Sequence, residues 1–187
     1  AEACEKRGVR FIGPAAEVIR RLGDKLQARA AMIEAGIPVT PGSENNLESV
    51  KEALTVAEKI GYPVMLKATN GGGGRGIRRC ADADELNRNF DRVVSEVSKT
   101  FGNPEVFLEK CIDTPRHIEV QVLGDQHGKV IHLFERDCSI QRRHQKLIEI
   151  APSPQLNDEQ RKYIGKLAVT AAKSVGYTNA GTVEFLL

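Results

Sequence analysis

Residues 62–76 read YPVMLKATNGGGGRG, in which an apolar run ends at Lys67 and a glycine-rich segment, 71–76, follows. Glycine has no Cβ atom, so such a segment can turn its backbone N–H groups toward an anion. The spacing differs from that of the P-loop, in which lysine and serine or threonine follow the last glycine, and from the interrupted glycines of the dinucleotide fingerprint. The pattern predicts a phosphate-binding loop of another kind, although a glycine run alone is also compatible with a flexible linker.

The composition is that of a globular domain. The 187 residues are 41% hydrophobic and 28% charged, which is enough to bury a core, and the formal net charge is only +2. A charge this small argues against nucleic acid as a partner, so any basic site must be local. The four cysteines are widely spaced, which predicts free thiols in a reducing compartment. The absence of a long apolar run and of a signal-peptide pattern predicts an intracellular protein with no membrane partner.

Periodicity and helix-capping residues predict the elements around the glycine-rich segment. Asp24, Asp82 and Asn157 stand where helices begin, and Glu85 completes a capping-box pattern with Asp82. Together these signals predict helices at 15–22, 24–35, 50–60, 82–97 and 157–175, and strands at 62–68, 106–109, 118–122, 130–135 and 181–187.

Strict alternation begins after Pro115. Apolar side chains at 118, 120 and 122 occupy one face of the predicted strand, and polar side chains at 117, 119 and 121 occupy the other. A turn at 125–128 leads into the strand at 130–135, so the two strands are expected to form an antiparallel hairpin with a polar working face.

The densest polar cluster is residues 135–146, ERDCSIQRRHQK, directly after the predicted hairpin. A solvated turn is the ordinary interpretation of such a run. Nucleic-acid contact is less favoured, because Glu135 and Asp137 interrupt the positive charge and no aromatic residue lies within the run. Guanidinium, ammonium and imidazole groups gathered at one place favour a small anion, such as a phosphate or a carboxylate-like substrate.

Several of these segments, taken in order, carry a family resemblance. The run KATN at 67–70 with the glycines after it, EKCI at 109–112, PRHIE at 115–119, and 136–146 followed by EIAP at 149–152 resemble the biotin carboxylase family of ATP-grasp enzymes. Within that family the chain is most similar to the biotin carboxylase domain of pyruvate carboxylases, through FERDCSIQ at 134–141 and NAGTVEF at 179–185.

The resemblance implies an α/β (α+β) chain with the ATP-grasp fold, in which ATP lies between a lid domain and a truncated, antiparallel-sheet catalytic domain. The implied divisions are a remnant of the N-terminal biotin carboxylase domain at 1–12, a helical linker at 13–40, the lid at 41–111 and the N-terminal part of the catalytic domain at 112–187. The chain is therefore expected to be a fragment of a larger polypeptide.

The same resemblance implies the nucleotide-binding residues. Lys25 and Lys67 would contact the ATP phosphates, Gly73 and Gly74 would lie at the tip of the lid, and His117 would lie on the nucleotide side of its strand. The hinge strand whose backbone meets the adenine edge would consist of Glu109, Lys110, Cys111 and Ile112.

The remaining implied roles concern the reaction. Gln141 and His144 would line the phosphate region, Lys146 would help to hold bicarbonate, and Glu184 would bind Mg²⁺, or Mn²⁺ in its place. Arg143 is expected to contact substrate, although it or Arg142 is equally suited to pairing with Glu149 or another carboxylate. Cys138 is expected to be a small buried residue that supports the loop.

The implied reaction is the MgATP-dependent conversion of bicarbonate to carboxyphosphate, followed by carboxylation of carrier-bound biotin. The implied partners are bicarbonate, the biotin carrier domain, the remaining carboxylase domains and, in the parent protein, further copies of it, in the cytoplasm or the mitochondrial matrix. Weak or no turnover is expected of this chain alone, because in complete members a second Mg²⁺-binding glutamate, a bicarbonate-binding arginine and the proposed base follow the strand that contains Glu184. Two alternatives stay open: a carbamoyl-phosphate synthase-like ligase, and a non-catalytic nucleotide-binding or interaction fragment.

Overall fold

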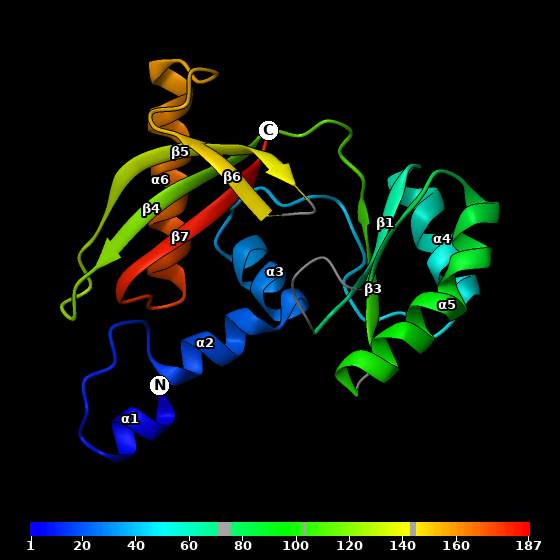
Figure 1. The fold of residues 1–187 in the computed structure, drawn as a ribbon, viewed down its shortest axis with the longest axis horizontal. Helices are drawn as coiled ribbons and strands as arrows, with labels where there is room; N and C mark the ends of the chain where they lie inside the picture. Colours follow the sequence, from blue (N-terminus) through cyan, green and yellow to red (C-terminus); the bar gives the residue numbers. More distant parts are fainter. Residues whose placement is uncertain (71–75, 103, 143–144) are drawn as a thin grey trace. The chain divides into compact units, whose positions relative to one another are not determined.

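The computed structural model describes residues 1–70, 76–102, 104–142 and 145–187 (Figure 1). The chain forms two compact units: unit 1 contains Ala1–Gly23, Ala31–Pro38 and Thr114–Leu187, and unit 2 contains Asp24–Ala30 and Val39–Asp113. In chain order the elements are α1 (Glu2–Lys6), α2 (Ala16–Gly23), α3 (Lys25–Glu34), α4 (Val50–Ile60), β1 (Val64–Ala68), β2 (Ile77–Cys80), α5 (Ala83–Phe101), β3 (Val106–Lys110), β4 (His117–Gly124), β5 (Val130–Arg142), β6 (Gln145–Ile150), α6 (Asp158–Ser174) and β7 (Asn179–Leu186).

Unit 2 is a three-stranded antiparallel sheet, ordered β2-β1-β3, with α4 and α5 packed against one of its faces (Figure 1). Val64 and Leu66 of β1 are fully buried in the core that these helices share. Because side chains alternate along a strand, Met65 and Lys67 belong to the opposite face of the sheet. Burial of the apolar face therefore directs Lys67 away from the core.

Side chains cap the helices of unit 2 at their N-termini. Ser49 accepts a hydrogen bond from the Glu52 amide at the start of α4, and Asp82 accepts one from the Glu85 amide, at 2.8 Å, at the start of α5. The predicted cap at Asp82 is confirmed, although the Glu85 carboxylate accepts from the Ala81 amide and not from that of Asp82. Each such cap contributes about 1 kcal/mol to stability.

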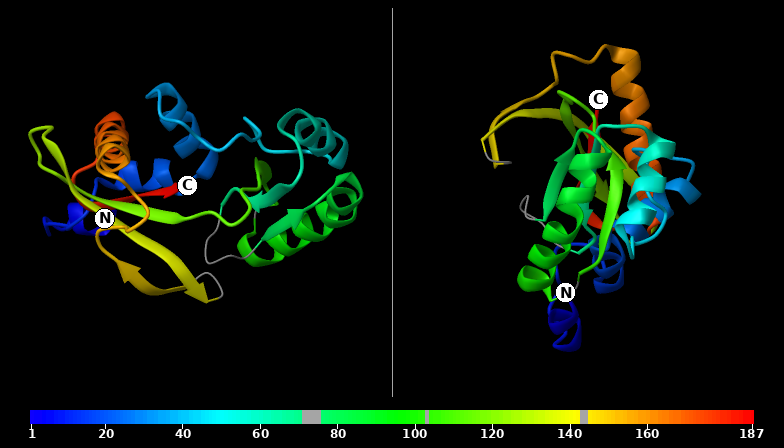
Figure 2. Two further views of the ribbon diagram at one scale, coloured as in Figure 1. Left: turned by 90° about the horizontal axis from the view of Figure 1, so that it is seen from above. Right: turned by 90° about the vertical axis from the view of Figure 1, so that its right-hand side faces the viewer.

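Unit 1 is built on a four-stranded antiparallel sheet, ordered β6-β5-β4-β7, with α6 packed on one face (Figures 1 and 2). The alternation predicted for β4 is confirmed in the core, where Ile118, Val120 and Val122 pack with Ile164 and other side chains of α6. The sheet curls, so that β6 lies away from α6 in both views of Figure 2. The other face of the sheet carries His117, Glu119 and Gln121 of β4, together with the exposed Leu123 at the far end of that strand.

A close approach between α6 and β5 requires a glycine. A Cβ atom added at Gly165 would lie 2.7 Å from the ring of His132, a separation that real side chains do not show. The capping box of Asn157 and Gln160 fixes the start of α6, in agreement with the helix predicted at 157–175. Gly165 and this cap together set how α6 lies on the sheet.

The main error of the sequence analysis concerns β5 and β6. The strand predicted at 130–135 continues to Arg142, so most of the polar cluster at 135–146 lies within strands and does not follow them. Two register irregularities interrupt the pairing of β5 with β6, between Asp137 and Ile140 and again at Gln141, and such bulges break the period of two that marks a strand. The short elements α1 and β2 were also not predicted.

The other predicted helices and strands are confirmed to within a few residues at their ends. The four predicted divisions of the chain stay predictions. No helix among the described residues is long and apolar enough to cross a membrane.

Candidate active site

A cluster of three cations around one carboxylate lies in unit 2, and we call Lys25, Arg29, Lys67 and Glu109 the cation cluster. Lys67 pairs with one oxygen of Glu109, and Arg29 lies 3.8 Å from the other. The side chains of Arg29, Glu109 and Lys67 are only 11%, 19% and 23% exposed. Positive charge exceeds negative charge in a partly desolvated place, which favours an anionic ligand.

Lys25 is held at the start of α3 by local structure. The Asp24 carboxylate accepts hydrogen bonds from the amides of Leu26 and Gln27, at 2.9 and 3.0 Å, which confirms Asp24 as the helix cap. The Lys25 ammonium donates to the carbonyl oxygens of Ala68 and Thr69, at 2.9 and 3.3 Å. Burial, followed by the charge of Lys67, lowers the pKa of Lys25 from its usual value.

The residues predicted to form the adenine hinge lie in and after β3. The Lys110 amide donates to the carbonyl oxygen of Pro41 at 2.7 Å, and the Cys111 amide donates to that of Pro63 at 2.9 Å. Both donors are therefore used within unit 2. Among the described residues, no hydrogen bond uses the amide of Ile112. The adenine contact stays a prediction, and within it Ile112 is the backbone donor that suits an adenine nitrogen.

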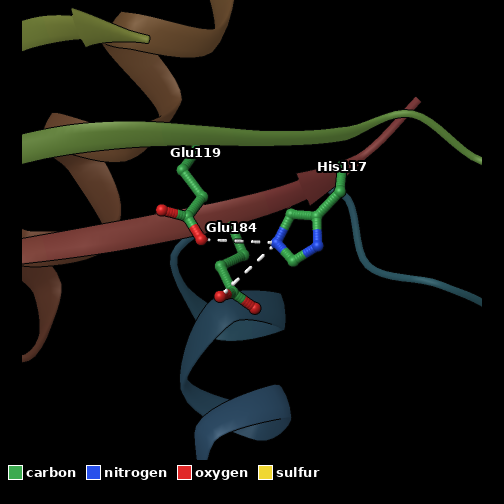
Figure 3. Close-up of side chains that lie close together, drawn as sticks. All are labelled: His117, Glu119 and Glu184. Atoms are coloured by element: carbon green, nitrogen blue, oxygen red, sulfur yellow. Dashed lines mark ion pairs between the residues drawn. The ribbon is translucent and has the colours of Figure 1, made fainter. Parts of the chain in front are cut away.

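A second cluster lies on the polar face of the unit 1 sheet, and we call His117, Glu119, Arg136, Lys146 and Glu184 the carboxylate cluster. His117 and Glu119 come from β4, and Glu184 comes from β7, where it stands directly opposite Glu119 (Figure 3). The His117 Nε2 atom lies 3.5 Å from Glu119 and 3.4 Å from Glu184. Ligand atoms of these three side chains all lie within 4.8 Å of one another, which is close enough to share one metal ion.

Glu119 is the buried centre of the carboxylate cluster, since its side chain is only 3% exposed. Arg136 donates to one of its oxygens at 3.1 Å, and Lys146 contacts the other. Lys146 also lies 3.3 Å from Glu184. An ammonium group thus stands between two carboxylates, so these residues fit a cation, and oxygen ligands of this kind are those that Mg²⁺ and Mn²⁺ prefer.

The contacts of Gln141 assign the tautomer of His117. The Gln141 side-chain nitrogen lies 2.9 Å from the Cys138 carbonyl oxygen and 2.8 Å from His117 Nδ1. A carbonyl oxygen accepts hydrogen bonds only, so this nitrogen donates to both, and neutral His117 then carries its proton on Nε2. A protonated Nε2 is a hydrogen-bond donor and not a metal ligand. With His117 in this tautomer, the groups of the cluster that could hold a metal ion are the two glutamates.

Among the described residues, Glu149 pairs with Arg136, at 3.6 Å, and not with Arg142, which was one of the two arginines considered as its partner. Arg142 is exposed at the end of β5. Gly73, Gly74, Arg143 and His144, which were predicted to contact nucleotide or substrate, lie outside the described residues.

Three residues of the two clusters, Arg29, Glu119 and Arg136, were not predicted as site residues. Glu119 and Arg136 carried a usable signal. Glu119 alternates with His117 along one strand, and Arg136 lies across from it on the next strand. Arg29 carried no comparable signal, because its partner Glu109 is distant along the chain.

Cys138 is fully buried, and its burial raises the pKa of the thiol, which keeps it protonated and unreactive. Its predicted supporting place is therefore consistent with its environment. All four cysteines are free thiols, as predicted.

Comparison with known proteins identifies the family of the chain. The family model for the carbamoyl-phosphate synthase L chain, ATP binding domain, matches residues 24–187. Over the whole chain, the sequence is 55% identical to the 2-oxoglutarate carboxylase small subunit of Hydrogenobacter thermophilus, 53% identical to mouse mitochondrial pyruvate carboxylase and 50% identical to biotin carboxylase 2 of Bacillus subtilis. The chain spans 39%, 16% and 42% of these proteins, respectively.

Solved structures give the same result. The biotin carboxylase domain dimer of the H. thermophilus 2-oxoglutarate carboxylase, in complex with MgADP, ADP and bicarbonate, superposes with a TM-score of 0.94 at 55% identity. The biotin carboxylase–ATP complex of Campylobacter jejuni superposes with a TM-score of 0.95 at 47% identity. Both similarities cover all of this chain, and 41% and 42% of those chains. The chain therefore belongs to the family of the carbamoyl-phosphate synthase L chain, ATP binding domain, and the ATP-grasp fold and biotin carboxylase relationship predicted from its sequence are confirmed.

Proposed function

We propose that this chain is the MgATP- and bicarbonate-binding part of a biotin carboxylase. The observation that carries the proposal is that the Lys146 ammonium lies between Glu119 and Glu184, an arrangement that can bind a cation. The chain is also 55% identical to a domain solved with MgADP and bicarbonate. The chain spans only 41% of that domain, so the complete reaction is proposed for the parent protein.

In unit 2, the cation cluster is the proposed site for the nucleotide phosphates. Lys25 and Lys67 supply ammonium groups, and an ATP tail carries several negative charges. Glu109, Lys110, Cys111 and Ile112 form the proposed adenine hinge, with the Ile112 amide as the donor. Gly73 and Gly74 complete the proposal as backbone donors from the glycine-rich segment.

In unit 1, Glu184 is the proposed Mg²⁺ ligand, and Glu119 lies beside it as a second carboxylate. A bound Mg²⁺, or Mn²⁺ in its place, neutralises phosphate charge as the phosphoryl group is transferred. Glu119 and Glu184 would hold the divalent cation in place of the Lys146 ammonium, and Lys146 would then be available to hold bicarbonate. Gln141 orients His117, whose Nε2–H can donate to a phosphate oxygen, and Arg143 and His144 are proposed as further contacts.

The proposed reaction begins with attack of a bicarbonate oxygen on the γ-phosphorus of ATP, which breaks the bond to ADP and forms carboxyphosphate. This intermediate breaks down to carbon dioxide and phosphate, and the ureido nitrogen of carrier-bound biotin takes up the carbon dioxide as its N–H proton passes to the released phosphate. Phosphoryl transfer depends mainly on positioning and charge neutralisation, so no covalent protein nucleophile is required.

A calorimetric titration tests the proposal on the chain itself. We expect saturable MgATP binding and, with magnesium and a non-hydrolysable ATP analogue present, bicarbonate binding that Lys146→Met abolishes. Lys162→Met, which removes an exposed lysine of α6, is the matched control and should bind bicarbonate like the wild type. A folded chain that binds neither MgATP nor its analogue contradicts the proposal.

A second candidate is a carbamoyl-phosphate synthase-like ligase, because the matching family model carries that description. Both activities phosphorylate bicarbonate, and they differ in the acceptor that follows. ¹⁴C from labelled bicarbonate should be trapped in biotin for the first and in an ammonia-derived product for the second. Dependence on ammonia and not on biotin would favour the second candidate, and nucleotide binding with no phosphorylation of bicarbonate would favour a non-catalytic fragment.

The partners proposed for the parent protein are the biotin carrier domain, the remaining carboxylase domains and a second copy of the protein. The H. thermophilus domain was solved as a dimer, and relatives of this chain include mitochondrial enzymes. An intracellular location, in the cytoplasm or the mitochondrial matrix, is part of the same proposal.

A further inference from the structure

Arg29 is a member of the cation cluster to which neither the sequence nor the proposed function gives a task. It lies on α3 one helical turn after Lys25, and its side chain is only 11% exposed. A buried guanidinium is costly unless its charge and its donors are satisfied. The burial of the Arg29 guanidinium beside Glu109 therefore needs a physical explanation.

The two oxygens of Glu109 have different partners. Lys67 pairs with Oε2, and the Arg29 Nη1 atom lies 3.8 Å from Oε1, which is within ion-pair range but beyond hydrogen-bond distance. The Arg29 Nε atom is buried and has no hydrogen-bond partner among the described residues. Arg29 therefore holds unused donors beside a carboxylate whose closer contact is a lysine.

The proposed function requires Lys67 to bind nucleotide phosphates, and Lys67 is held by Glu109. Departure of Lys67 would leave a carboxylate that is only 19% exposed without its main counter-charge. Leaving a mostly buried charge unpaired is strongly unfavourable. A second cation able to take over Glu109 removes most of that penalty, and within the described part of the chain Arg29 lies in ion-pair range of its other oxygen.

We propose that Arg29 is a positioning residue that acts through Glu109: it takes over the Glu109 carboxylate and so releases Lys67 to an anionic ligand, the phosphate chain of a nucleotide. Guanidinium suits this task because it can move from a single long contact to a bidentate pair with the same carboxylate. This inference rests on the proposed function, since it assumes that Lys67 binds phosphate. Arg29 itself does not touch the ligand.

The experiment is a double-mutant cycle on the 187-residue chain, with Arg29→Met, Glu109→Gln and the double variant titrated with MgATP and with adenosine. Arg29→Met should weaken MgATP binding about fivefold and should leave adenosine binding unchanged. A fivefold change corresponds to the largest free energies measured for one exposed ion pair. In the Glu109→Gln background no carboxylate competes for Lys67, so Arg29→Met should then change MgATP affinity less than twofold. Arg29→Lys should restore only part of the wild-type affinity, because an ammonium keeps the charge but cannot form the bidentate pair.

Arg78→Met is the matched control, because Arg78 forms an exposed ion pair with Glu96 in the same unit and should leave both affinities unchanged. An equal loss from Arg29→Met in both backgrounds would mean that Arg29 contacts phosphate directly, and would overturn the inference. If Arg29→Met lowers the affinities for MgATP and adenosine equally and also lowers the unfolding midpoint, Arg29 has a structural role only, and the inference is overturned. A folded wild-type chain that binds no MgATP would instead overturn the proposed function, and the inference with it.

Discussion

The cation cluster of unit 2 and the carboxylate cluster of unit 1 both contain a lysine–glutamate pair, but they differ in their balance of charge. In each, a lysine predicted to bind substrate is paired with a glutamate: Lys67 with Glu109, and Lys146 with Glu119. Unit 2 places three cations around one carboxylate, whereas unit 1 sets Arg136 and Lys146 against Glu119 and Glu184. The surplus in unit 2 suits a polyanion, and the balance in unit 1 suits exchange of an ammonium group for a metal ion.

The largest effect expected from this difference belongs to Lys67. Lys67→Met should weaken MgATP binding about 10- to 100-fold, because a charge-assisted contact worth about 1.5–3 kcal/mol is lost. Calorimetry measures this, and Mn²⁺ binding without nucleotide should be unaffected. Lys51→Met, at an exposed position of α4, is the control. If both variants bind MgATP equally well, the cation cluster is not the phosphate site.

The complementary substitution is in unit 1. Glu184→Gln should lower Mn²⁺ affinity about tenfold, measured by the paramagnetic resonance signal of unbound Mn²⁺ without nucleotide, because one of two ligand carboxylates loses its charge. Glu159→Gln removes an exposed carboxylate of α6 and should have no effect. Equal Mn²⁺ affinities for the two variants would place the metal elsewhere.

The division into two units predicts separate effects on stability. Asp82→Ala and Asn157→Ala each remove a helix cap and should cost about 1 kcal/mol, the first in unit 2 and the second in unit 1. Hydrogen exchange should become faster only in the unit that carries each substitution. Asn87→Ala, at an exposed position within α5, should change stability by less than about 0.5 kcal/mol. Uniform acceleration across the chain would contradict two separately stable units.

The smallest expected effect is a pH dependence of nucleotide affinity. Burial and the charge of Lys67 lower the pKa of Lys25 below its usual value of 10.5, and a phosphate beside it would raise that pKa again. MgATP affinity should therefore fall as the pH rises through the lowered pKa. Lys25→Arg keeps its charge and should give a flatter curve in calorimetric titrations at alkaline pH.

The same pKa shift makes an opposite prediction for stability. Because the folded chain holds the Lys25 proton less tightly than the unfolded chain, the Lys25 contribution to the free energy of unfolding should rise with pH between the lowered pKa and 10.5. In urea denaturation, the free energy of unfolding of the wild type should rise with pH relative to that of Lys25→Arg over this range. An MgATP affinity of the wild type that does not fall across the same range would place Lys25 away from the phosphates.

The predictable part of the fold was the part with local signals. Caps at Asp24, Asp82 and Asn157 marked where helices begin, and alternation through β4 placed His117 on the polar face of its strand. The same alternation could also have identified Glu119 as a site residue, because Glu119 occupies the same face. It is the most buried member of its cluster. Family resemblance supplied the proposed roles of Lys67 and Glu184, which no periodicity could give.

The unpredicted part depends on contacts between distant residues. β6 and the second half of β5 are irregular strands, whose bulges at 137–141 erase the pattern that identifies a strand. Arg29 is on a helix, one turn after Lys25, where a single arginine is typical of a solvated face. Only the tertiary approach of β3 shows that its partner is Glu109.

The division of the chain also sets an order of events during synthesis. Unit 2 is complete once Asp113 has been made, whereas unit 1 needs residues on both sides of unit 2, as when Asn179 donates to the carbonyl oxygen of Gly13 at 2.7 Å. Domains tend to fold as units while the chain grows from its N-terminus. The cation cluster can therefore assemble while the chain is still growing, before β7, which carries Glu184, has been made, whereas the first segment of unit 1 cannot complete its contacts until the last segment exists.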